Sequence, residues 1–148
     1  MLREGAGMAS AVRLLIFRGE KEGWNMNWYI EVLKKYAVFG GRARRKEYWF
    51  FFLFNILISI GLAVIDNAMG GFSAEAGIGL LGGIYALAVL IPGIAVAVRR
   101  LHDTDKSGWW LLIAFVPVIG TIVLIIFLAL DSKPGPNRFG DNPKETAA

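Results

Sequence analysis

Residues 108–130 read GWWLLIAFVPVIGTIVLIIFLAL, 23 consecutive positions without one charged side chain. Two more charge-free stretches precede this one, 18 residues at 48–65 and 23 residues at 76–98. The hydrocarbon core of a bilayer is about 30 Å thick and needs roughly 20 helical residues to cross it. Helices of a soluble protein of this size carry a polar face, which these stretches lack. The sequence therefore predicts an all-α integral membrane protein with three transmembrane helices, at about 48–66, 77–98 and 109–130.

The composition of the 148-residue chain agrees with this class of protein and excludes several others. The chain is 55% hydrophobic and contains no cysteine, so a disulfide scaffold, a thiolate metal site and a cysteine nucleophile are excluded. The net charge is +4, which in a soluble protein would suggest a nucleic-acid partner. Here the basic residues flank the apolar stretches, where lipid headgroups account for them. The expected partner is therefore the lipid bilayer and not nucleic acid.

The sequence divides into four regions. Residues 1–25 are expected to form a poorly structured N-terminal extension, for which an upstream start of translation is one explanation. Residues 26–47 are expected to form a short interfacial amphipathic helix and a basic turn, because polar and apolar side chains fall on opposite sides of a helical wheel. The three-helix domain occupies 48–130, and residues 131–148 form a tail rich in proline and glycine.

The distribution of Lys and Arg predicts the orientation in the membrane. Six lie at 26–47 and three at 99–107, whereas three lie in the tail and none at 66–75. With three spans the first two groups share one side, nine against three, and the positive-inside rule makes that side the cytoplasm. The N-terminus is then cytoplasmic and the tail lies outside. The alternative is a re-entrant third segment that turns at Pro117 and Gly120, which would return the tail to the cytoplasmic side.

Two polar turns, one before the first span and one between the second and third, contain the candidate binding residues. These candidates are Arg42, Arg44, Arg45, Arg99, Arg100, His102, Asp103 and Asp105. Each cation near a membrane surface attracts anionic headgroups by about 1 kcal/mol, although a topology signal explains the same basic cluster. Because both turns lie at one membrane face, we expect a shared network in which the carboxylates of Asp103 and Asp105 accept hydrogen bonds from guanidinium groups.

Neither turn predicts a metal, a cofactor or a catalytic centre. His102, Asp103 and Asp105 carry metal-capable donor atoms, but three ligands so close in sequence rarely complete a site. His102 has no serine or cysteine partner nearby for a hydrolytic triad. We therefore expect no metal, no cofactor and no catalytic residue. The turn at 99–107 is interpreted as structural or ligand-binding, with Ser107 capping the helix that follows.

Small and aromatic residues at the spans have predicted roles of their own. Two small-x-x-x-small patterns lie in the second span, and this spacing lets helix backbones approach closely. The predicted packing residues are Gly79, Gly83, Gly93 and Ala97. Such contacts form within a chain or between chains, so a homo-oligomer or a membrane partner is an open possibility. The predicted interface anchors are Trp49, Trp109 and Trp110.

The tail contains three prolines and two glycines within the ten residues 134–143. These residues prevent a regular helix or strand and impose turns. The patch NRFG at 137–140 suggests a segment that docks on the rest of the protein, and a disordered tail is the alternative.

Several motifs, in order along the chain, resemble one known family. They are Trp28-Tyr29, GRARRKEYW at 41–49, RRLHDTDKSGWW at 99–110 and PGPNRFG at 134–140. Over about 26–143 the chain resembles the domain of unknown function 805 family, YhaH-like small bacterial inner-membrane proteins. Members of the family usually begin near Met26, which supports the interpretation of 1–25 as an extension. The resemblance implies the bacterial inner membrane and a small helical fold, and it implies no substrate, cofactor or catalytic residue.

Two classes of function fit these observations. The favoured one is a multi-pass inner-membrane protein without enzymatic activity, which binds anionic lipid headgroups or a protein partner through its cytoplasmic polar turns. The alternative is a membrane-embedded enzyme or small-molecule carrier that uses the turn RRLHDTD at 99–105. The charge-free spans favour the first class, because proton relays and ion-coupled transport need ionisable groups inside the membrane.

Overall fold

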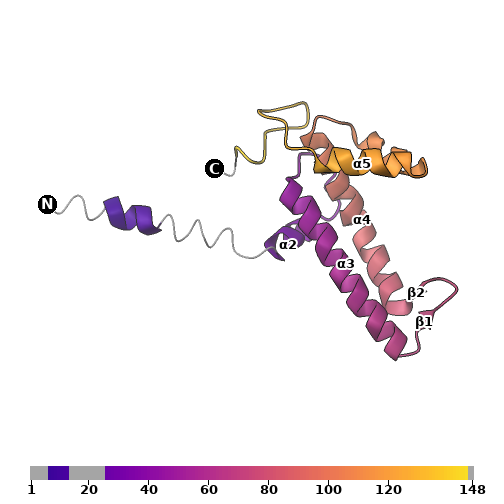
Figure 1. Cartoon of the computed structure of the whole chain (residues 1–148). Coiled ribbons are helices and arrows are strands. Elements are labelled where there is room, and N and C mark those ends of the chain that lie inside the picture. The colour runs from indigo at the N-terminus through magenta and orange to yellow at the C-terminus, as the bar shows by residue number, and fades with distance from the viewer. Residues whose placement is uncertain (1–6, 14–25, 147–148) are drawn as a thin grey trace.

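The computed structural model describes residues 7–13 and 26–146. In chain order the elements are α2 (Met26–Lys34), α3 (Arg45–Ala68), β1 (Phe72–Ser73), β2 (Ile78–Gly79), α4 (Leu80–Asp103), the 3₁₀ helix η1 (Gly108–Phe115) and α5 (Ile119–Ala129). The predicted extension at 1–25 lies outside the described residues except for 7–13, which are helical. The described part of the chain is therefore mostly helical, as Figure 1 shows and as the sequence predicted.

Helices α3 and α4 form an antiparallel hairpin, which is the longest part of the structure (Figure 1). Each has 24 residues and is long and apolar enough to cross a membrane. Large apolar side chains such as Val64 and Leu87 are exposed along both helices. Apolar segments favour the helix because it satisfies their N–H and C=O groups internally. The first two predicted spans are therefore present as helices whose outer surface suits contact with lipid tails.

A buried carboxylate closes the far end of the hairpin. Asp66, in the last turn of α3, accepts hydrogen bonds from the backbone N–H groups of Leu81 (3.0 Å) and Gly82 (2.9 Å). These groups belong to the first turn of α4, where an N–H has no partner within the helix. The short antiparallel pair of β1 and β2 leads the chain to this point. Asp66 therefore caps α4 and fixes the two helices to each other.

The four small residues of the second span differ from one another in their surroundings. Gly79 precedes α4, and a Cβ atom on it would lie 2.2 Å from the Asp66 carboxyl group. A Cβ atom on Gly83 would meet no atom of the described residues within 4 Å, so Gly83 is not in close contact with another described helix. A Cβ on Gly93 would lie 3.8 Å from an α3 side chain, and Ala97 is buried. A contact of Gly83 between chains stays a prediction.

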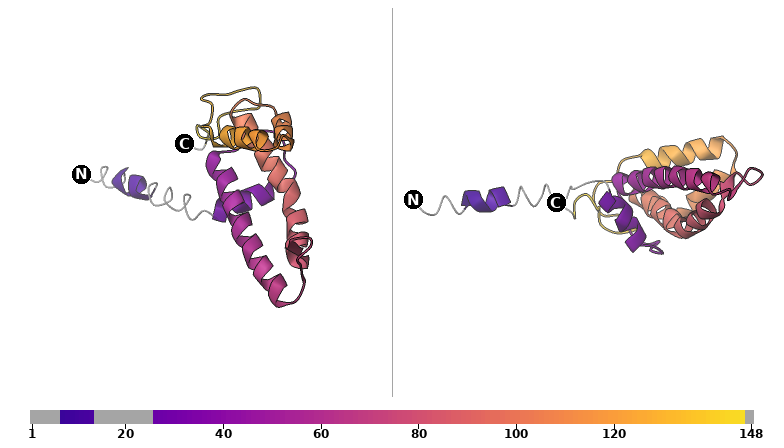
Figure 2. Two further views of the ribbon diagram at one scale, coloured as in Figure 1. Left: turned by 45° about the vertical axis from the view of Figure 1, so that its right-hand side comes forward. Right: turned by 90° about the horizontal axis from the view of Figure 1, so that it is seen from below.

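Helix α2 packs against the hairpin through its apolar side. Tyr29 and Val32 are buried in a cluster with Phe51 and Val96, whereas Lys34 is exposed. The Tyr29 and Phe51 rings stack with their centroids 5.3 Å apart. Both views in Figure 2 show α2 beside α3. The predicted amphipathic helix is present, and its position in the membrane interface stays a prediction.

The third predicted span, 109–130, is not one continuous helix. It is divided into η1 and α5 by a break at 116–118. Pro117 has no N–H and its ring clashes with the preceding turn of a helix, so it interrupts the helical hydrogen bonding. Val118 then takes a positive φ of 62°, which turns the chain. The prediction of three transmembrane helices is therefore not confirmed, and the described residues contain two helices of spanning length.

The two halves of this segment lie across the end of the hairpin instead of beside α3 and α4 (Figures 1 and 2). They contact each other through the rings of Trp110 and Phe127, which meet edge to face at 5.3 Å. The hydroxyl of Ser107 accepts a hydrogen bond from the N–H of Trp109, as predicted for the residue that caps this segment. The segment therefore begins and ends at the same end of the hairpin.

The tail folds back over the end of α4. The backbone N–H of Lys133 donates to the carbonyl of Asp103 at 3.0 Å. The described tail residues, 131–146, form turns and one isolated bridge between Asn137 and Gly140, as the prolines and glycines predicted. The expectation that the tail lies on the opposite side from the turn at 99–107 is wrong, because the two are in contact.

Candidate functional site

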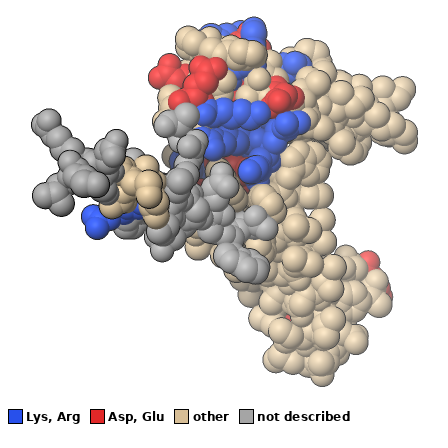
Figure 3. Space-filling view, turned by 60° about the vertical axis from the view of Figure 1, so that its left-hand side comes forward, with Lys and Arg blue, Asp and Glu red and all other residues tan. Residues whose placement is uncertain are grey.

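Charged side chains gather at one end of the hairpin, where α3 begins, α4 ends and the tail folds back. We call this region the polar cap, and it consists of residues 40–47, 99–107 and 131–146. Figure 3 shows Lys, Arg, Asp and Glu concentrated at this end, whereas the body of the hairpin is almost free of charge on the face shown. The polar cap therefore contains both of the polar turns that the sequence singled out.

The carboxylate of Asp103 is the centre of the polar cap. Its Oδ1 accepts a hydrogen bond from Arg42 Nε at 2.9 Å, and its Oδ2 accepts from Arg100 Nη1 and Ser132 Oγ, both at 2.5 Å. The side chains of Asp103 and Arg100 are fully buried, and that of Arg42 is 1% exposed. Buried charges are tolerated only when they are paired and hydrogen-bonded. This cluster therefore requires three separate segments of the chain to be together.

Arg42 links the turn before α3 to the tail. Its Nη1 donates to the carbonyl of Gly135 at 2.8 Å and, at 3.4 Å, to that of Gly140. Its Nη2 donates to the carbonyls of Lys133 at 2.6 Å and Asp103 at 3.2 Å. With the bond from Nε to the carboxylate, every N–H group of this guanidinium has an acceptor. Arg42 is therefore a structural organiser of the tail.

Arg100 holds the end of α5 against the end of α4. Its Nε donates to the carbonyl of Leu128 at 3.0 Å, and its Nη2 donates to that of Leu130. Carbonyls in the last turn of a helix have no partner within the helix and carry partial negative charge, so a guanidinium suits them. Its Nη1 also lies 3.4 Å from the carbonyl of Ala43. These contacts explain why the chain returns to the polar cap after α5.

A second buried ion pair lies between the two long helices. Glu47 Oε1, in the first turn of α3, accepts from Arg99 Nη1 at 2.6 Å. The N–H of Ala43 donates to the carbonyl of Arg99 at 3.0 Å. Among the described residues, Nε and Nη2 of Arg99 have no hydrogen-bond partner. The pair fixes the start of α3 to the last turns of α4.

Exposed ion pairs lie outside the buried ones. Asp105 contacts Lys133 Nζ at 2.8 Å and Arg138 Nε at 3.5 Å. The hydrogen bond from Lys133 lowers the pKa of the Asp105 carboxyl group. Exposed pairs stabilise a protein by about 0–1 kcal/mol each. They therefore orient the tail more than they stabilise the fold.

The two other arginines of the predicted basic cluster do not reach Asp103. Arg45 pairs with Asp131 at 3.4 Å, and both side chains are exposed. Arg44 Nε donates to the tail carbonyl of Pro143 at 2.8 Å. Arg42 lies in the turn before α3, Arg44 directly precedes the helix and Arg45 is its first residue, and of the three only Arg42 enters the buried cluster.

The tail patch at 137–140 docks on His102. The ring of Phe139 stacks on the imidazole with the centroids 3.8 Å apart and the planes at 4°. Asn137 Nδ2 donates to the carbonyl of His102 at 2.9 Å, and His102 Nδ1 lies 3.1 Å from the carbonyl oxygen of Gly41. The docked alternative for this patch is therefore confirmed over the disordered one.

The predicted network between guanidinium groups and carboxylates is present at Asp103, whose partners come from the two polar turns as expected, and differs at Asp105. Asp103 pairs with Arg42 as well as with its own neighbour Arg100, whereas Asp105 pairs with tail residues. Glu47 was not among the predicted site residues, although a single acidic residue in a run of basic ones indicates an ion pair. Ser132 was missed because its position depends on the return of the chain after α5. A binding role for these residues stays a prediction.

The predicted anchor residues lie at or next to the polar cap. Trp49 is half-buried near the start of α3, and Trp109 and Trp110 lie in η1 with 79% and 45% of their surface exposed. Their anchoring in a membrane interface stays a prediction. The described part of the chain contains no group of three or more His, Asp or Glu residues that could hold a metal ion.

Comparison with known proteins places the chain in a family. A family model described as Protein of unknown function (DUF805) matches residues 36–141. Inner membrane protein YhaH of Escherichia coli (strain K12) is 48% identical over 119 residues, which cover 80% of this chain and 98% of the relative. Inner membrane protein YhaI of the same strain is 46% identical over 119 residues, 80% of this chain and 97% of the relative. No solved structure matches. The resemblance seen in the motifs is thus confirmed, and the chain belongs to the DUF805 family of bacterial inner-membrane proteins.

Proposed function

We propose that this protein is a non-enzymatic inner-membrane protein that binds anionic lipid headgroups through the exposed cations at its polar-cap end. The observation that carries the proposal is the division of charge between the two ends of the hairpin. The segments 26–47, 99–107 and 131–146 hold twelve Lys and Arg against seven Asp and Glu. The loop at 66–79 holds two acidic residues and no Lys or Arg. One end therefore attracts anionic headgroups, and the other repels them.

The same division supports a topology with two spans. If η1 and α5 enter the membrane from the polar cap and return to it, the twelve Lys and Arg of 26–47, 99–107 and 131–146 all lie on one side. The positive-inside rule makes that side the cytoplasm. This arrangement satisfies the rule better than three spans, which leave three cations of the tail outside. The N-terminal segment, the turn at 99–107 and the tail are then all cytoplasmic.

Burial divides the cations of this end into two groups. Arg42, Arg99 and Arg100 are buried and bond to the protein itself, so they organise the site and do not face a lipid. The exposed cations include Lys34, Lys46 and Arg138, of which Lys34 and Arg138 also form exposed ion pairs with Glu31 and Asp105. Headgroup binding is therefore assigned to the second group.

An enzyme or carrier that uses the turn at 99–105 is not favoured by any of these contacts. Arg100 and Asp103 are fully buried and bond to each other. The ring of His102 is covered on one face by Phe139. A substrate could not reach Arg100 or Asp103 without displacing the groups that bury them.

Lipid titration with native mass spectrometry tests the proposal. Purified protein in detergent is titrated with phosphatidylglycerol and, separately, with phosphatidylcholine, and bound lipids are counted. We expect tighter binding of the anionic lipid. The triple variant Lys34→Gln, Lys46→Gln, Arg138→Gln should bind it about fivefold more weakly per removed charge, because each surface cation contributes about 1 kcal/mol.

A charge-conserving triple variant, Lys34→Arg, Lys46→Arg, Arg138→Lys, is the matched control and should bind as the original protein does. Equal binding of the two lipids, or unchanged binding after the three charges are removed, would refute headgroup recognition by these residues.

Cysteine labelling tests the two-span topology. Because the chain has no native cysteine, the reagent labels only the introduced residue. A cysteine at Ser73 should react with an impermeant maleimide in intact spheroplasts. A cysteine at Thr146 should react only after the membrane is opened. Reaction at Thr146 in intact spheroplasts would show that the tail lies outside, as three spans require.

A further inference from the structure

Helix α4 contains a proline at its middle, which leaves one backbone carbonyl without its helical partner. The helix runs without interruption from Leu80 to Asp103, and Pro92 lies inside it. In an α-helix the N–H of each residue donates to the carbonyl four positions earlier. Position 92 would serve the carbonyl of Ala88, but proline has no N–H to donate. The Ala88 carbonyl therefore needs a donor from elsewhere.

Tyr36 supplies that donor. Its hydroxyl donates to the carbonyl oxygen of Ala88 at 2.6 Å, across 52 positions of sequence. Within a membrane no water is available to an unpaired carbonyl, and helices with proline are tolerated where a neighbouring group satisfies the freed oxygen. The hydroxyl of Tyr36, just after α2, thus supplies the hydrogen bond that Pro92 removes from α4.

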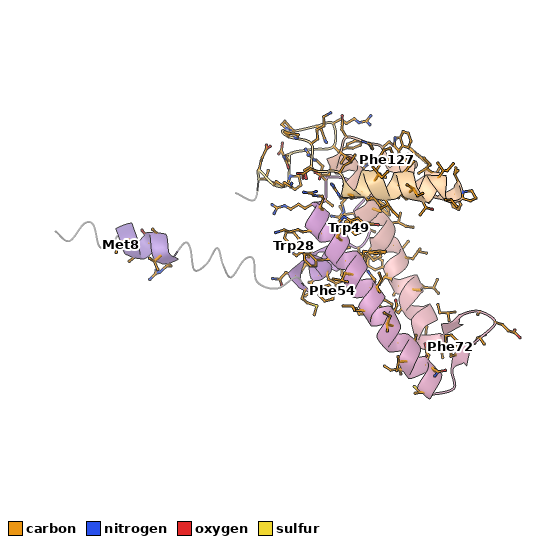
Figure 4. All side chains as sticks on the ribbon, in the orientation of Figure 1. Met8, Trp28, Trp49, Phe54, Phe72 and Phe127 are labelled. Carbon is orange, nitrogen blue, oxygen red and sulfur yellow. The ribbon has the colours of Figure 1, made fainter. Side chains whose placement is uncertain are left out.

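A second contact holds the same segment in place. The hydroxyl groups of Tyr29 and Tyr85 lie 3.0 Å apart, and that of Tyr85 donates to Asn55 Oδ1 at 2.6 Å. One hydrogen-bonded chain therefore connects α2, α4 and α3. Figure 4 shows α2 against α3 near the labelled Phe54, whose ring lies 5.9 Å from that of Tyr29.

We propose that α2 and Tyr36 form a latch that closes the backbone gap of α4 at Pro92. While the latch is closed, the Ala88 carbonyl is bonded and the helix is held in one conformation. When α2 leaves the hairpin, the carbonyl loses its donor and α4 becomes free to bend at Pro92, which is followed by Gly93. The side chain of Tyr36 is 44% exposed, so the bond lies at the edge of the protein. This device does not depend on lipid binding by the polar cap.

The latch is tested by a double-mutant cycle on thermal unfolding in detergent. Tyr36→Phe removes only the hydroxyl group and should lower the Tm by roughly 2–6 °C, the effect of one lost hydrogen bond in a domain of this size. Pro92→Ala restores an N–H that bonds to Ala88 within the helix. In the Pro92→Ala background, Tyr36→Phe should therefore lower the Tm by less than a third of that amount. Equal losses in the two backgrounds would overturn the latch.

Hydrogen exchange decides the question even if Pro92→Ala does not fold. In Tyr36→Phe, the backbone amides of 89–91 and 93–96 should exchange about fivefold faster, which corresponds to one hydrogen bond of about 1 kcal/mol. The amides of 53–65 in α3 should be unchanged. Tyr48→Phe is the matched control, because no hydrogen bond of that hydroxyl occurs within the described residues. Unchanged exchange at 89–91 and 93–96 in Tyr36→Phe, or an equal change in Tyr48→Phe, would show that no latch exists.

Discussion

The two ends of the α3–α4 hairpin are each closed by a buried carboxylate, in two different ways. Asp66 accepts hydrogen bonds only from backbone N–H groups 15 and 16 positions away. Asp103 pairs with two guanidinium groups, one of them 61 positions away, and with a hydroxyl of the tail. The far end is therefore closed locally by the start of α4, whereas the polar cap is closed only when remote segments meet. Closure of the far end therefore needs only the two helices and the loop between them, whereas closure of the polar cap needs segments from the whole described chain.

The largest expected effect is that of Asp103→Asn. The change leaves Arg42 and Arg100 buried without a countercharge, and removal of one partner of a buried ion pair costs about 3–5 kcal/mol. Thermal unfolding followed by circular dichroism in detergent measures the loss. Asp131→Asn, at a side chain that is 60% exposed, is the control and should cost far less, because exposed ion pairs are screened by solvent. Equal losses in the two variants would mean that the buried cluster does not hold the polar cap together.

The next effect is at the far end. Gly79→Ala should cost about 1–3 kcal/mol, because its Cβ atom would lie 2.2 Å from the Asp66 carboxyl group and one of the two must move. Gly83→Ala, where a Cβ meets nothing within 4 Å among the described residues, should stabilise by about 0.5–1 kcal/mol as an ordinary helical exchange. A spin label at Thr146 should show an unchanged, docked tail in both variants. Release of the tail by Gly79→Ala would show that the two ends are coupled.

A smaller effect separates the arginines of the basic turn. Arg42→Gln combined with Asp103→Asn should depart from additivity by roughly 1 kcal/mol or more, because the two side chains are in contact. Arg45→Gln combined with Asp103→Asn should be additive within about 0.5 kcal/mol, because Arg45 pairs with Asp131 instead. Unfolding free energies of the single and double variants give both values. Coupling of Arg45 as strong as that of Arg42 would contradict the observed partners.

The smallest effect is a loosening of the tail in acid. Hydrogen bonds from Lys133 and Lys144 hold the pKa values of Asp105 and Asp131 below their ordinary 3.8. Because these contacts lower both pKa values, the two ionised carboxylates stabilise the docked tail fully above about pH 4. This stabilisation is lost as the pH falls through the lower pKa values of the folded protein. A spin label at Thr146 should become more mobile over that range, and a label at Ser73 should not. Parallel changes at both positions would instead indicate general unfolding.

The candidate site was only partly predictable, because sequence shows which charges are present and not which of them meet. The spacing predicted that Asp103 would pair with guanidinium groups, and Arg100 is a neighbour on the same helix at i−3. The choice of Arg42 over Arg44 and Arg45 depends on how the turn before α3 approaches α4. That approach is set by the hydrogen bond from the Ala43 N–H to the Arg99 carbonyl, a contact without a sequence pattern.

The sequence by itself determined that this is a helical membrane protein, because long charge-free segments can satisfy their backbone groups only as helices within a membrane. It also determined the capping of η1 by Ser107 and the irregular, turn-rich tail, which follow from the chemistry of single residues. Only the tertiary structure decided the path of 108–130. Hydropathy is the same for a segment that crosses a membrane and for one that folds back at Pro117. The bonds from Arg100 to the carbonyls of Leu128 and Leu130, 28 and 30 positions away, bring the chain back to the end of α4.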